Sequence, residues 1–321
     1  MKIAVIGPGA VGSYYGAKLS RAGHEVHFLL RSDYEVVRRN GVKVLSPEGD
    51  FNARPKCATQ AQEIAVADLV LIALKTTANE LLHEFLPPLV GKNTAVLTLQ
   101  NGLGNEEKIA EIVPAEQILG GLCFVCLNRI QPGVIHHIAH GKIELGEFGR
   151  WPEPRTHDIA SAFRHAGIPC SVRDNLEKAH WEKLVWNIPF NGLGVASCAG
   201  YDAVRTGIFG GRVSECLTTD KLLADPSWFE LVRTLMQEVI ASGNAFGLKI
   251  DEALADVLIE NTKKMAAYKP STLIDFERDQ PVELDTIFLE PLRLAESKGV
   301  NVPHLRALCA ILETLNTVAK K

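Results

Sequence analysis

Hydrophobic residues in the first half of the chain recur as short unbroken runs, separated by segments with helical spacing. Such runs suit strands that are buried on both faces of a parallel sheet. The pattern predicts a helix at Ala10–Ala22 and five strands, at Lys2–Ile6, Glu25–Leu30, Leu69–Leu74, Thr94–Leu99 and Ile168–Val172. Weaker runs predict edge strands at Leu119–Leu127, Gly133–His137 and Lys142–Leu145, with Gly133 and Gly141 in turns. Alternating strands and helices indicate an α/β Rossmann-type fold.

Apolar residues from Asn175 onward follow helical spacing instead. The predicted helices are Asn175–Asn187, Pro226–Phe246, Asp251–Lys264, Thr286–Lys298 and a last helix from Pro303. Asp225 and Asp251 are typical helix starts, and Gly247 and Gly299 are typical stops. We therefore expect two domains, a Rossmann-type α/β domain at residues 1–173 and an all-α domain at residues 174–321.

Length and charge are compatible with this division and narrow the choice of partners. A chain of 321 residues is long enough for two domains. Its 34 basic and 38 acidic residues give a net charge of −4, so no basic surplus points to nucleic acid. No apolar run approaches the ~18 residues of a membrane-spanning helix. Gly7-Pro8-Gly9 interrupts the first apolar run, which argues against a signal peptide. We expect a soluble, cytoplasmic protein, and its oligomeric state stays open, with a homodimer as one arrangement.

The seven cysteines do not indicate a disulfide framework, because their number is odd and the chain is long. Cys123 and Cys126 form a C-x-x-C, but no second pair or nearby histidine completes a zinc site. We expect no metal site and interpret these thiols as buried or site-lining groups.

A glycine-rich turn follows the first predicted strand. Its residues are Gly7, Pro8, Gly9, Ala10, Val11 and Gly12, which fit G-x-G-x-x-G between a strand and a helix. The first glycine permits a tight turn, the second lets the backbone approach a pyrophosphate, and the third allows close helix–strand packing. The helix N-terminus then faces the anion. The alternative is a purely structural turn.

Arg31 follows the end of the second predicted strand, where an NAD site would usually carry an acid for the ribose 2′-hydroxyl. Glu25 lies at the start of that strand and Asp33 lies beyond its end. A guanidinium at this position suits a 2′-phosphate, so the sequence predicts NADP rather than NAD. The alternative is a solvated surface arginine.

Lys183, Asn187 and Asn191 are spaced i, i+4 and i+8, which places them on one helical stripe about 80° wide. One cation and two amides on a stripe can polarise a carbonyl and hold a small polar acid. Pro189 removes a donor and should kink the helix, so Asn191 could lie beyond a bend. The alternative is a capped, partly exposed helix start. His180 is a second candidate for an acid–base group.

These motifs together resemble the ketopantoate reductase (2-dehydropantoate 2-reductase) family over nearly the whole chain. The matching blocks, in order, are residues 7–12, Arg31, Leu74-Lys75-Thr76, Gln100-Asn101-Gly102-Leu103-Gly104, Lys183 with Asn187 and Asn191, and residues 269–273 through 283–285. The glycine turn is common to many dehydrogenases, whereas the later blocks together are far more specific.

The resemblance implies a Rossmann-type NADPH domain and an all-α domain, as in 6-phosphogluconate-dehydrogenase-like folds. It implies reduction of 2-dehydropantoate to pantoate, on the route to pantothenate and coenzyme A, with a small 2-oxo acid as substrate. By the family pattern Lys183 donates the proton to the developing alkoxide. The implied substrate contacts are Asn101, Asn187, Asn191 and Ser271. The implied cofactor contacts beyond the glycine turn and Arg31 are Lys75, Asn101, Cys126 and Glu283.

Each of these residues also has a structural interpretation. Lys75 could simply reach solvent after a buried strand, and Asn101 with Gly102 is a common turn pair. Ser271 could cap a helix after Pro270, and Glu283 could be a solvated helix charge.

Departures from the family pattern bear on the substrate. Tyr201 and Tyr268 stand where some members have asparagines near the substrate, and residues 287–290 replace a segment that often contains glycine. Cys126 falls where a small residue commonly faces the cofactor. Two other functions stay open: a β-hydroxyacid dehydrogenase of the same architecture, and a non-catalytic module that senses NADP.

Overall fold

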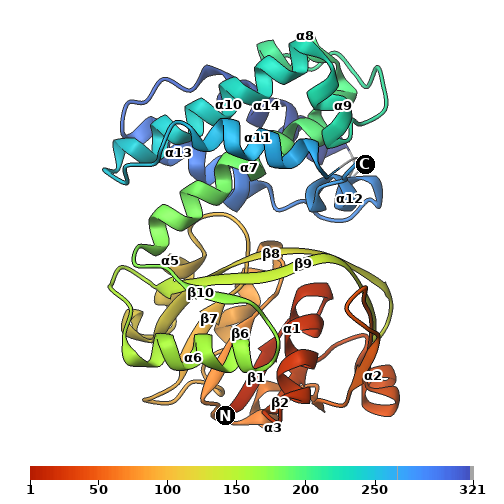
Figure 1. The fold of residues 1–321 in the computed structure, drawn as a ribbon, viewed down its shortest axis with the longest axis vertical. Helices are drawn as coiled ribbons and strands as arrows, with labels where there is room; N and C mark the ends of the chain where they lie inside the picture. Colours follow the sequence, from red (N-terminus) through yellow and green to blue (C-terminus); the bar gives the residue numbers. More distant parts are fainter. Residues whose placement is uncertain (266, 319–321) are drawn as a thin grey trace. The chain divides into compact units, whose positions relative to one another are not determined.

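The computed structural model describes residues 1–265 and 267–318. These residues divide into two compact units (Figure 1). The first unit contains Met1–Gln100 and Asn105–Leu176, and the second contains Asn101–Gly104 together with the chain from Glu177 onward. The short segment Asn101–Gly104 therefore belongs with the helices, although its neighbours in sequence belong with the strands.

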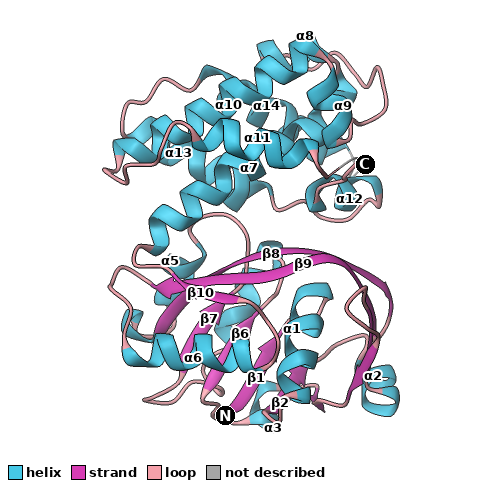
Figure 2. Cartoon of the chain, in the orientation of Figure 1, coloured by secondary structure: helices cyan, strands magenta, loops and turns pink. Residues whose placement is uncertain are grey.

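The strands lie in the first unit (Figure 2). Their bounds are β1 Lys2–Ile6, β2 Glu25–Leu29, β3 Val42–Leu45, β4 Phe51–Ala53, β5 Lys56–Ala58, β6 Leu69–Ile72, β7 Ala95–Thr98, β8 Ile118–Gln131, β9 Val134–Glu147 and β10 Cys170–Val172. They form one sheet in the order β4-β3-β9-β8-β7-β6-β1-β2-β5, and β10 pairs with β9. The pairs from β2 through β1, β6 and β7 to β8 are parallel, so these strands end at the same edge. The expected Rossmann-type fold is confirmed.

Strand β1 shows why these short apolar runs form a central sheet. Ile3 and Val5 pack into one hydrophobic cluster, whereas Ala4 and Ile6 pack into another. Because successive side chains of a strand point to opposite faces, a run that is apolar throughout fills the core on both sides. Helices supply the other half of each core: Tyr14 and Phe163 belong to the first cluster.

The first unit has six helices of α type among its described residues, with two 3₁₀ turns. Their bounds are α1 Ala10–Arg21, α2 Tyr34–Asn40, α3 Ala61–Ile64, η1 Thr76–Leu81, α4 Leu82–Phe85, α5 Asn105–Ala110, η2 Ala115–Gln117 and α6 Pro154–His165. Strands are present at the three weaker predicted ranges, but their expected place at an edge was wrong, because β8 and β9 form one long hairpin inside the sheet. Gly133 lies in the hairpin turn as expected, but Gly141 lies within β9 beside an irregularity in the β8–β9 pairing.

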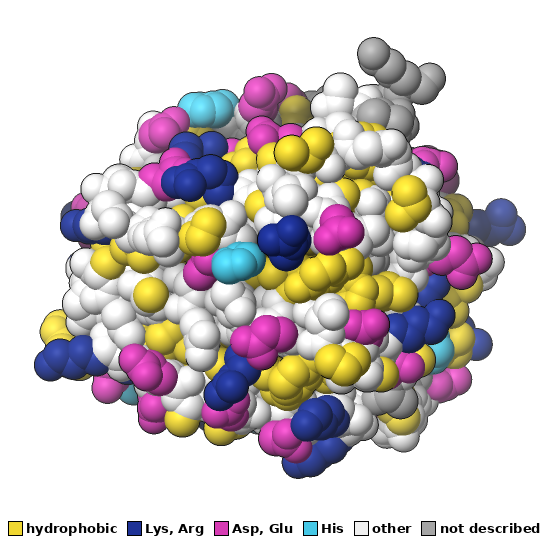
Figure 3. Space-filling model, turned by 90° about the horizontal axis from the view of Figure 1, so that it is seen from above, with side chains coloured by type: hydrophobic (Ala, Val, Ile, Leu, Met, Phe, Trp, Pro, Cys, Tyr) yellow, Lys and Arg dark blue, Asp and Glu magenta, His cyan; other side chains and the backbone are white. Residues whose placement is uncertain are grey.

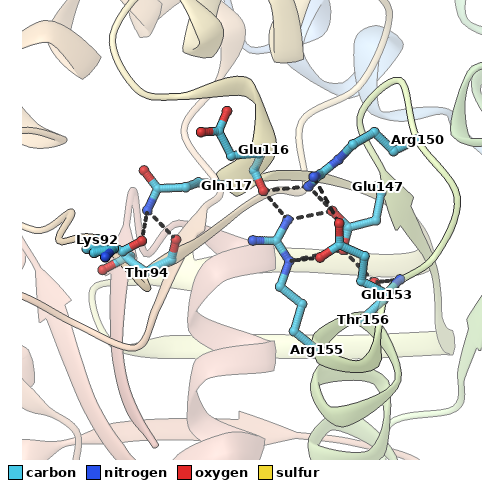
Figure 4. A network of polar contacts seen from close by, with 9 residues as sticks. All are labelled: Lys92, Thr94, Glu116, Gln117, Glu147, Arg150, Glu153, Arg155 and Thr156. Atoms are coloured by element: carbon cyan, nitrogen blue, oxygen red, sulfur yellow. Dashed lines mark hydrogen bonds and ion pairs between the residues drawn. The ribbon is translucent and has the colours of Figure 1, made fainter.

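A buried ion-pair network joins the end of β9 to the start of α6 (Figure 4). The fully buried carboxylate of Glu147 accepts bonds from Arg150 at 3.1 Å and Arg155 at 2.5 Å, and also from the Thr156 hydroxyl. Both arginines donate further to the carbonyl oxygen of Glu116. A buried carboxylate is stable only when charge and hydrogen bonds satisfy it, and these partners do so.

The second unit is built from helices. Their bounds are α7 Leu176–Ala196, η3 Ser197–Ala199, α8 Tyr201–Thr206, α9 Thr219–Ala224, α10 Pro226–Ala245, α11 Leu254–Lys263, α12 Ser271–Glu277, a π-helix η4 at Asp285–Leu289, α13 Glu290–Ser297 and α14 Pro303–Val318. The prediction that the first of these ends at Asn187 was wrong, because α7 continues through Pro189. Every residue from Asn187 to Ala199 is buried, and packing on all sides explains why one missing backbone donor does not end the helix.

Helix α10 shows the expected start and stop signals. The Asp225 side chain accepts hydrogen bonds from the amides of Ser227 and Trp228, and Gly247 follows the helix at a φ of 79°. Val232, Leu235 and other apolar residues of α10 join α7 and α14 in one core. These local signals fix where the longest helix of the second unit after α7 lies.

The face of the molecule drawn in Figure 3 carries hydrophobic, basic and acidic side chains interspersed, so neither sign of charge covers it continuously. Over residues 1–265 and 267–318, no helix combines the length and apolar character needed to cross a membrane.

Candidate active site

The glycine-rich turn joins β1 to α1 within the first unit. Gly7 has a φ of 75°, and a Cβ there would lie 2.6 Å from the backbone nitrogen of Leu74. At Gly12 a Cβ would lie 2.8 Å from the carbonyl oxygen of Gly7. At Gly9, by contrast, the nearest atom would be 4.0 Å away. Packing therefore requires glycine at the first and third positions, while the second glycine leaves open space in front of the backbone.

The same turn presents backbone donors to that space. Helix α1 begins at Ala10, has no acid in its first turn, and has no side-chain cap. Among the described residues, none accepts a hydrogen bond from the amides of Val11 or Gly12. Unbonded amides at the positive end of a helix dipole are the ordinary site for a phosphate group. The turn thus fits the pyrophosphate of a dinucleotide.

Polar groups follow the ends of the neighbouring parallel strands. Lys75 comes after β6 and is exposed. Gln100, after β7, is buried, and its Nε2 donates to the carbonyl oxygen of Leu74 at 3.1 Å and to Oδ1 of Asn79 at 2.6 Å. Ligands of open α/β sheets bind beyond the carboxyl ends of such strands. Because Gln100 binds the carbonyl group of Leu74, it fixes the turn that carries Lys75.

The end of β2 is followed by a basic and an acidic residue that differ in exposure and in ion pairing. Arg31 is exposed and has no ion pair within the described parts of the chain. Asp33 is buried, and its carboxylate accepts three hydrogen bonds from Arg129, a residue of β8. Cys126, in the same strand, is buried in register with Ala139 of β9.

The segment Asn101–Gly104 is held by the π-helix of the second unit. The amide of Leu103 donates to the carbonyl oxygen of Thr286 at 2.9 Å, and the Leu103 side chain packs into the helical core. Gly102 has a φ of 88°, and a Cβ there would lie 2.2 Å from the same carbonyl oxygen of Thr286. Only glycine fits this position without moving the backbone.

Lys183 and Asn101 meet in the second unit. Nζ of Lys183 donates to Oδ1 of Asn101 at 2.8 Å, across 82 residues of sequence. Asn187 lies one turn further along α7 and is buried, as is His180, one turn before Lys183. The lysine is half-buried, and Oδ1 of Asn101 orients its amine.

The remaining predicted site residues have mixed surroundings. Oδ1 of Asn191 accepts the backbone amide of Thr272 at 3.1 Å, so this buried side chain holds the start of α12. Ser271 is the exposed first residue of α12, and the helix cap is Pro270 rather than the serine. Glu283 is half-buried, two residues before the π-helix. The structure thus gives Asn191 a positioning contact that the spacing of the stripe did not reveal.

A protonated amine oriented by an amide can polarise a carbonyl group and supply a proton to it. Within the described portion of the chain, no group of three or more His, Cys, Asp or Glu side chains could hold a metal ion. The orientation of the Lys183 amine by Asn101 suits acid catalysis by a side chain.

Sequence reasoning assigned no role to Thr286 or to Gln100, although Gln100 lies in one of the matching blocks. Thr286 acts through its backbone carbonyl, which no residue type signals. The π-helix around it is a conformation often found near functional sites, but it is visible only in the structure.

Comparison with known proteins decides the family. Two family models match this chain: ketopantoate reductase PanE/ApbA at residues 3–150 and the C-terminal region of the same family at residues 211–316. The chain belongs to the ketopantoate reductase family. The expected family, fold and oxidoreductase class are thereby confirmed, and members of this family depend on NAD(P).

Individual relatives of this reductase agree over nearly their full length. A 2-dehydropantoate 2-reductase of Nostoc sp. is 40% identical over 98% of this chain and 95% of its own. Among solved structures, the 2-dehydropantoate 2-reductase of Geobacter metallireducens is 44% identical with a TM-score of 0.89, covering 98% of this chain and 99% of its own. That of Methylococcus capsulatus is 33% identical with a TM-score of 0.88, covering 100% of this chain and 98% of its own.

Proposed function

We propose that this reductase converts 2-dehydropantoate to pantoate with NADPH, a step toward pantothenate and coenzyme A. The observation that carries the proposal is the 2.8 Å contact between Lys183 and Asn101, because it orients an amine as a carbonyl-reducing site requires. The names of the relatives support the substrate, since those from Nostoc and Geobacter are 2-dehydropantoate 2-reductases.

We assign cofactor binding chiefly to the first unit. The glycine turn, residues 7–12, would hold the pyrophosphate on its unbonded amides, and Arg31 would hold the 2′-phosphate. Lys75 and Cys126 of the same unit, with Asn101 and Glu283 of the second, complete the proposed contacts. When bound, NADPH supplies the hydride that reduces the ketone.

We assign the proton to Lys183. Negative charge develops on the C2 oxygen of the substrate as the ketone is reduced, and an ammonium group stabilises that charge more than it stabilises the neutral ketone. The amine then delivers its proton to this oxygen, which gives the alcohol. Oδ1 of Asn101 accepts a bond from Nζ and so limits the directions in which the amine can point.

Substrate contacts are proposed for Asn101, Asn187, Asn191 and Ser271. Amide and hydroxyl groups suit the carboxylate and hydroxyl of 2-dehydropantoate, because both ends of this acid form hydrogen bonds. Asn191 would act with its amide nitrogen, since its oxygen accepts the amide of Thr272. We further propose that residues 1–173 and 174–321 are the two functional domains and that neither catalyses the reaction alone.

A steady-state assay of NADPH oxidation tests the function. The matched substrates are 2-dehydropantoate and 3,3-dimethyl-2-oxobutanoate, which differ only in the terminal hydroxyl group. We expect kcat/KM to be at least ~10-fold higher for 2-dehydropantoate, because a site that bonds a hydroxyl discriminates against the analogue without it. Equal rates, or faster reduction of another 2-oxo acid, would instead indicate a different substrate. Cofactor binding without turnover of any 2-oxo acid would indicate a sensing module.

A further inference from the structure

The acidic residue Asp33 lies two positions after Arg31, close to the end of β2, where this fold binds the ribose of a dinucleotide. An acid at the end of β2 normally accepts a bond from a 2′-hydroxyl and repels a 2′-phosphate. The next acid, Glu35, is exposed and pairs with Arg38 within α2. Asp33 is therefore the side chain that could oppose the binding of NADPH.

The structure turns the Asp33 carboxylate toward a distant arginine. Asp33 occupies the cap position of α2, yet its side chain makes no capping bond. Nε of Arg129 lies 3.0 Å from Oδ2, and Nη2 lies 2.5 Å from Oδ1 and 2.6 Å from Oδ2. The Asp33 side chain is 10% exposed, against 41% for Arg129. A bidentate guanidinium pair of this kind fixes the direction of the carboxylate as well as its charge.

Arg31 differs from Asp33 in exposure and in ion pairing. It is exposed and has no ion pair in residues 1–265 and 267–318. The hairpin of β8 and β9 supplies Arg129 from 96 residues away, so the pairing is not a local consequence of the turn after β2. The result is one acid whose charge is neutralised next to one base whose charge is not.

We propose that Arg129 determines cofactor specificity: by binding Asp33 it removes an acid from the ribose site and leaves Arg31 to attract the 2′-phosphate. The inference rests on the proposed use of NADPH. With Arg129 present, the three side chains sum to one positive charge. Without it, Arg31 and Asp33 sum to zero, and a carboxylate becomes available to a 2′-hydroxyl. Arg129 is thus a specificity-determining residue and takes no part in the chemical step.

The experiment measures dissociation constants for NADPH and NADH by isothermal titration calorimetry on the full chain. In Arg129→Met we expect the NADH-to-NADPH ratio of these constants to fall by ~10- to 100-fold, mostly through weaker binding of NADPH. In Asp33→Asn the ratio should stay within about threefold of the parent. The double variant should recover most of the preference, because the arginine is not needed once the acid is gone.

Two further variants keep the test decisive. Arg21→Met removes an equal charge from the last turn of α1, where the guanidinium stacks on Phe51, and should leave the ratio unchanged. Arg129→Lys keeps the charge but not the bidentate geometry, so its NADH-to-NADPH ratio of dissociation constants should lie between those of the parent and Arg129→Met. If Arg129→Met does not fold, this lysine variant decides the question.

An unchanged ratio in Arg129→Met, or in Arg129→Lys where only that variant folds, would overturn the inference. So would a double variant that behaves like Arg129→Met. These results are distinct from failure of the proposed function. A parent protein that prefers NADPH but does not reduce 2-dehydropantoate would remove the proposed reaction and leave the role of Arg129 intact. A parent that binds both cofactors equally would remove the NADPH assignment and, with it, this inference.

Discussion

Two glycine-containing turns follow parallel strands in this protein, and each packs against a different unit. The turn at residues 7–12 follows β1 and closes on its own unit, where Gly7 packs against the backbone of Leu74. The segment at residues 101–104 follows β7 but belongs to the second unit, where Gly102 packs against the carbonyl group of Thr286. Both positions have positive φ angles, at 75° and 88°.

The difference concerns what each turn depends on. The conformation of the first turn depends only on the strand before it, the helix after it and a neighbouring strand. A motif of a few consecutive residues is therefore enough to recognise it in the sequence. The second needs a π-helix and a lysine that are far away in sequence, and its motif alone is a common turn pair. We infer that the first turn serves cofactor binding and that the second serves the chemical step.

Replacing Lys183 should separate these two roles most strongly. We expect Lys183→Ala to lower kcat by ~10²-fold or more, because the developing alkoxide loses its proton donor. The dissociation constant for NADPH should stay within about threefold, since the glycine turn is untouched. Steady-state assays and calorimetry on the same preparation measure both quantities.

Lys178 provides the matched control for that variant. It also lies on α7, and its Nζ donates to the carbonyl oxygen of Lys249 at 2.9 Å. Lys178→Ala should therefore keep the parent kcat. Normal turnover by Lys183→Ala would contradict the assignment of Lys183 as the proton donor.

Alanine at the two positive-φ glycines should produce different defects. Gly102→Ala places a Cβ against the Thr286 carbonyl, so residues 101–104 must shift, and kcat should fall about 10-fold or more as Asn101 moves. Gly7→Ala should mainly weaken NADPH binding. Each variant should also lower the free energy of unfolding by ~2 kcal/mol through strain and contact.

Gly23 isolates the contribution of strain alone. Its φ is 89°, and a Cβ there would meet no atom within 4 Å. Gly23→Ala should lower the free energy of unfolding by ~1 kcal/mol and change neither kcat nor NADPH binding. If Gly102→Ala and Gly7→Ala showed the same pair of defects, the division of roles between the turns would be wrong.

The sequence predicts those parts of the fold that local pattern controls. Strand β1 and helix α1 lie where the pattern places them, because an apolar run and a glycine turn suffice. Strands β4 and β5 have three residues each, too few for a periodic signal, and their neighbours in the sheet position them. Helix α7 outlasts its predicted end because its surroundings are apolar on every side.

The candidate site divides in the same way. The glycine turn and the stripe on α7 are local patterns, so the residues can be named in advance. The partner of each polar group cannot, because Asn101 lies 82 residues from Lys183 and Arg129 lies 96 residues from Asp33. No periodicity connects such positions, and only the folded chain brings them together.

Gly9 offers a smaller effect that is specific to the first turn. A Cβ there would lie 4.0 Å from the nearest atom, so the methyl group of alanine meets no close neighbour outside the turn. We expect Gly9→Ala to raise the NADPH dissociation constant about 5- to 10-fold, because the methyl group fills space meant for the pyrophosphate. Unchanged NADPH binding would mean that the open space at this turn has no ligand role.

Asn191 should show a small effect on stability, and it tests whether long-range contacts also order α12 in the second unit. Its Oδ1 holds the amide of Thr272 across 81 residues. Asn191→Ala should lower the free energy of unfolding by ~1 kcal/mol, as loss of a helix cap does. Asn191→Asp keeps an acceptor at the start of α12 and should restore that stability in denaturant titrations. If the proposed substrate contact is also real, the aspartate repels the substrate carboxylate, so KM for 2-dehydropantoate should rise in both variants. A KM that rises in Asn191→Ala and returns to normal in Asn191→Asp would instead make Asn191 a positioning residue alone.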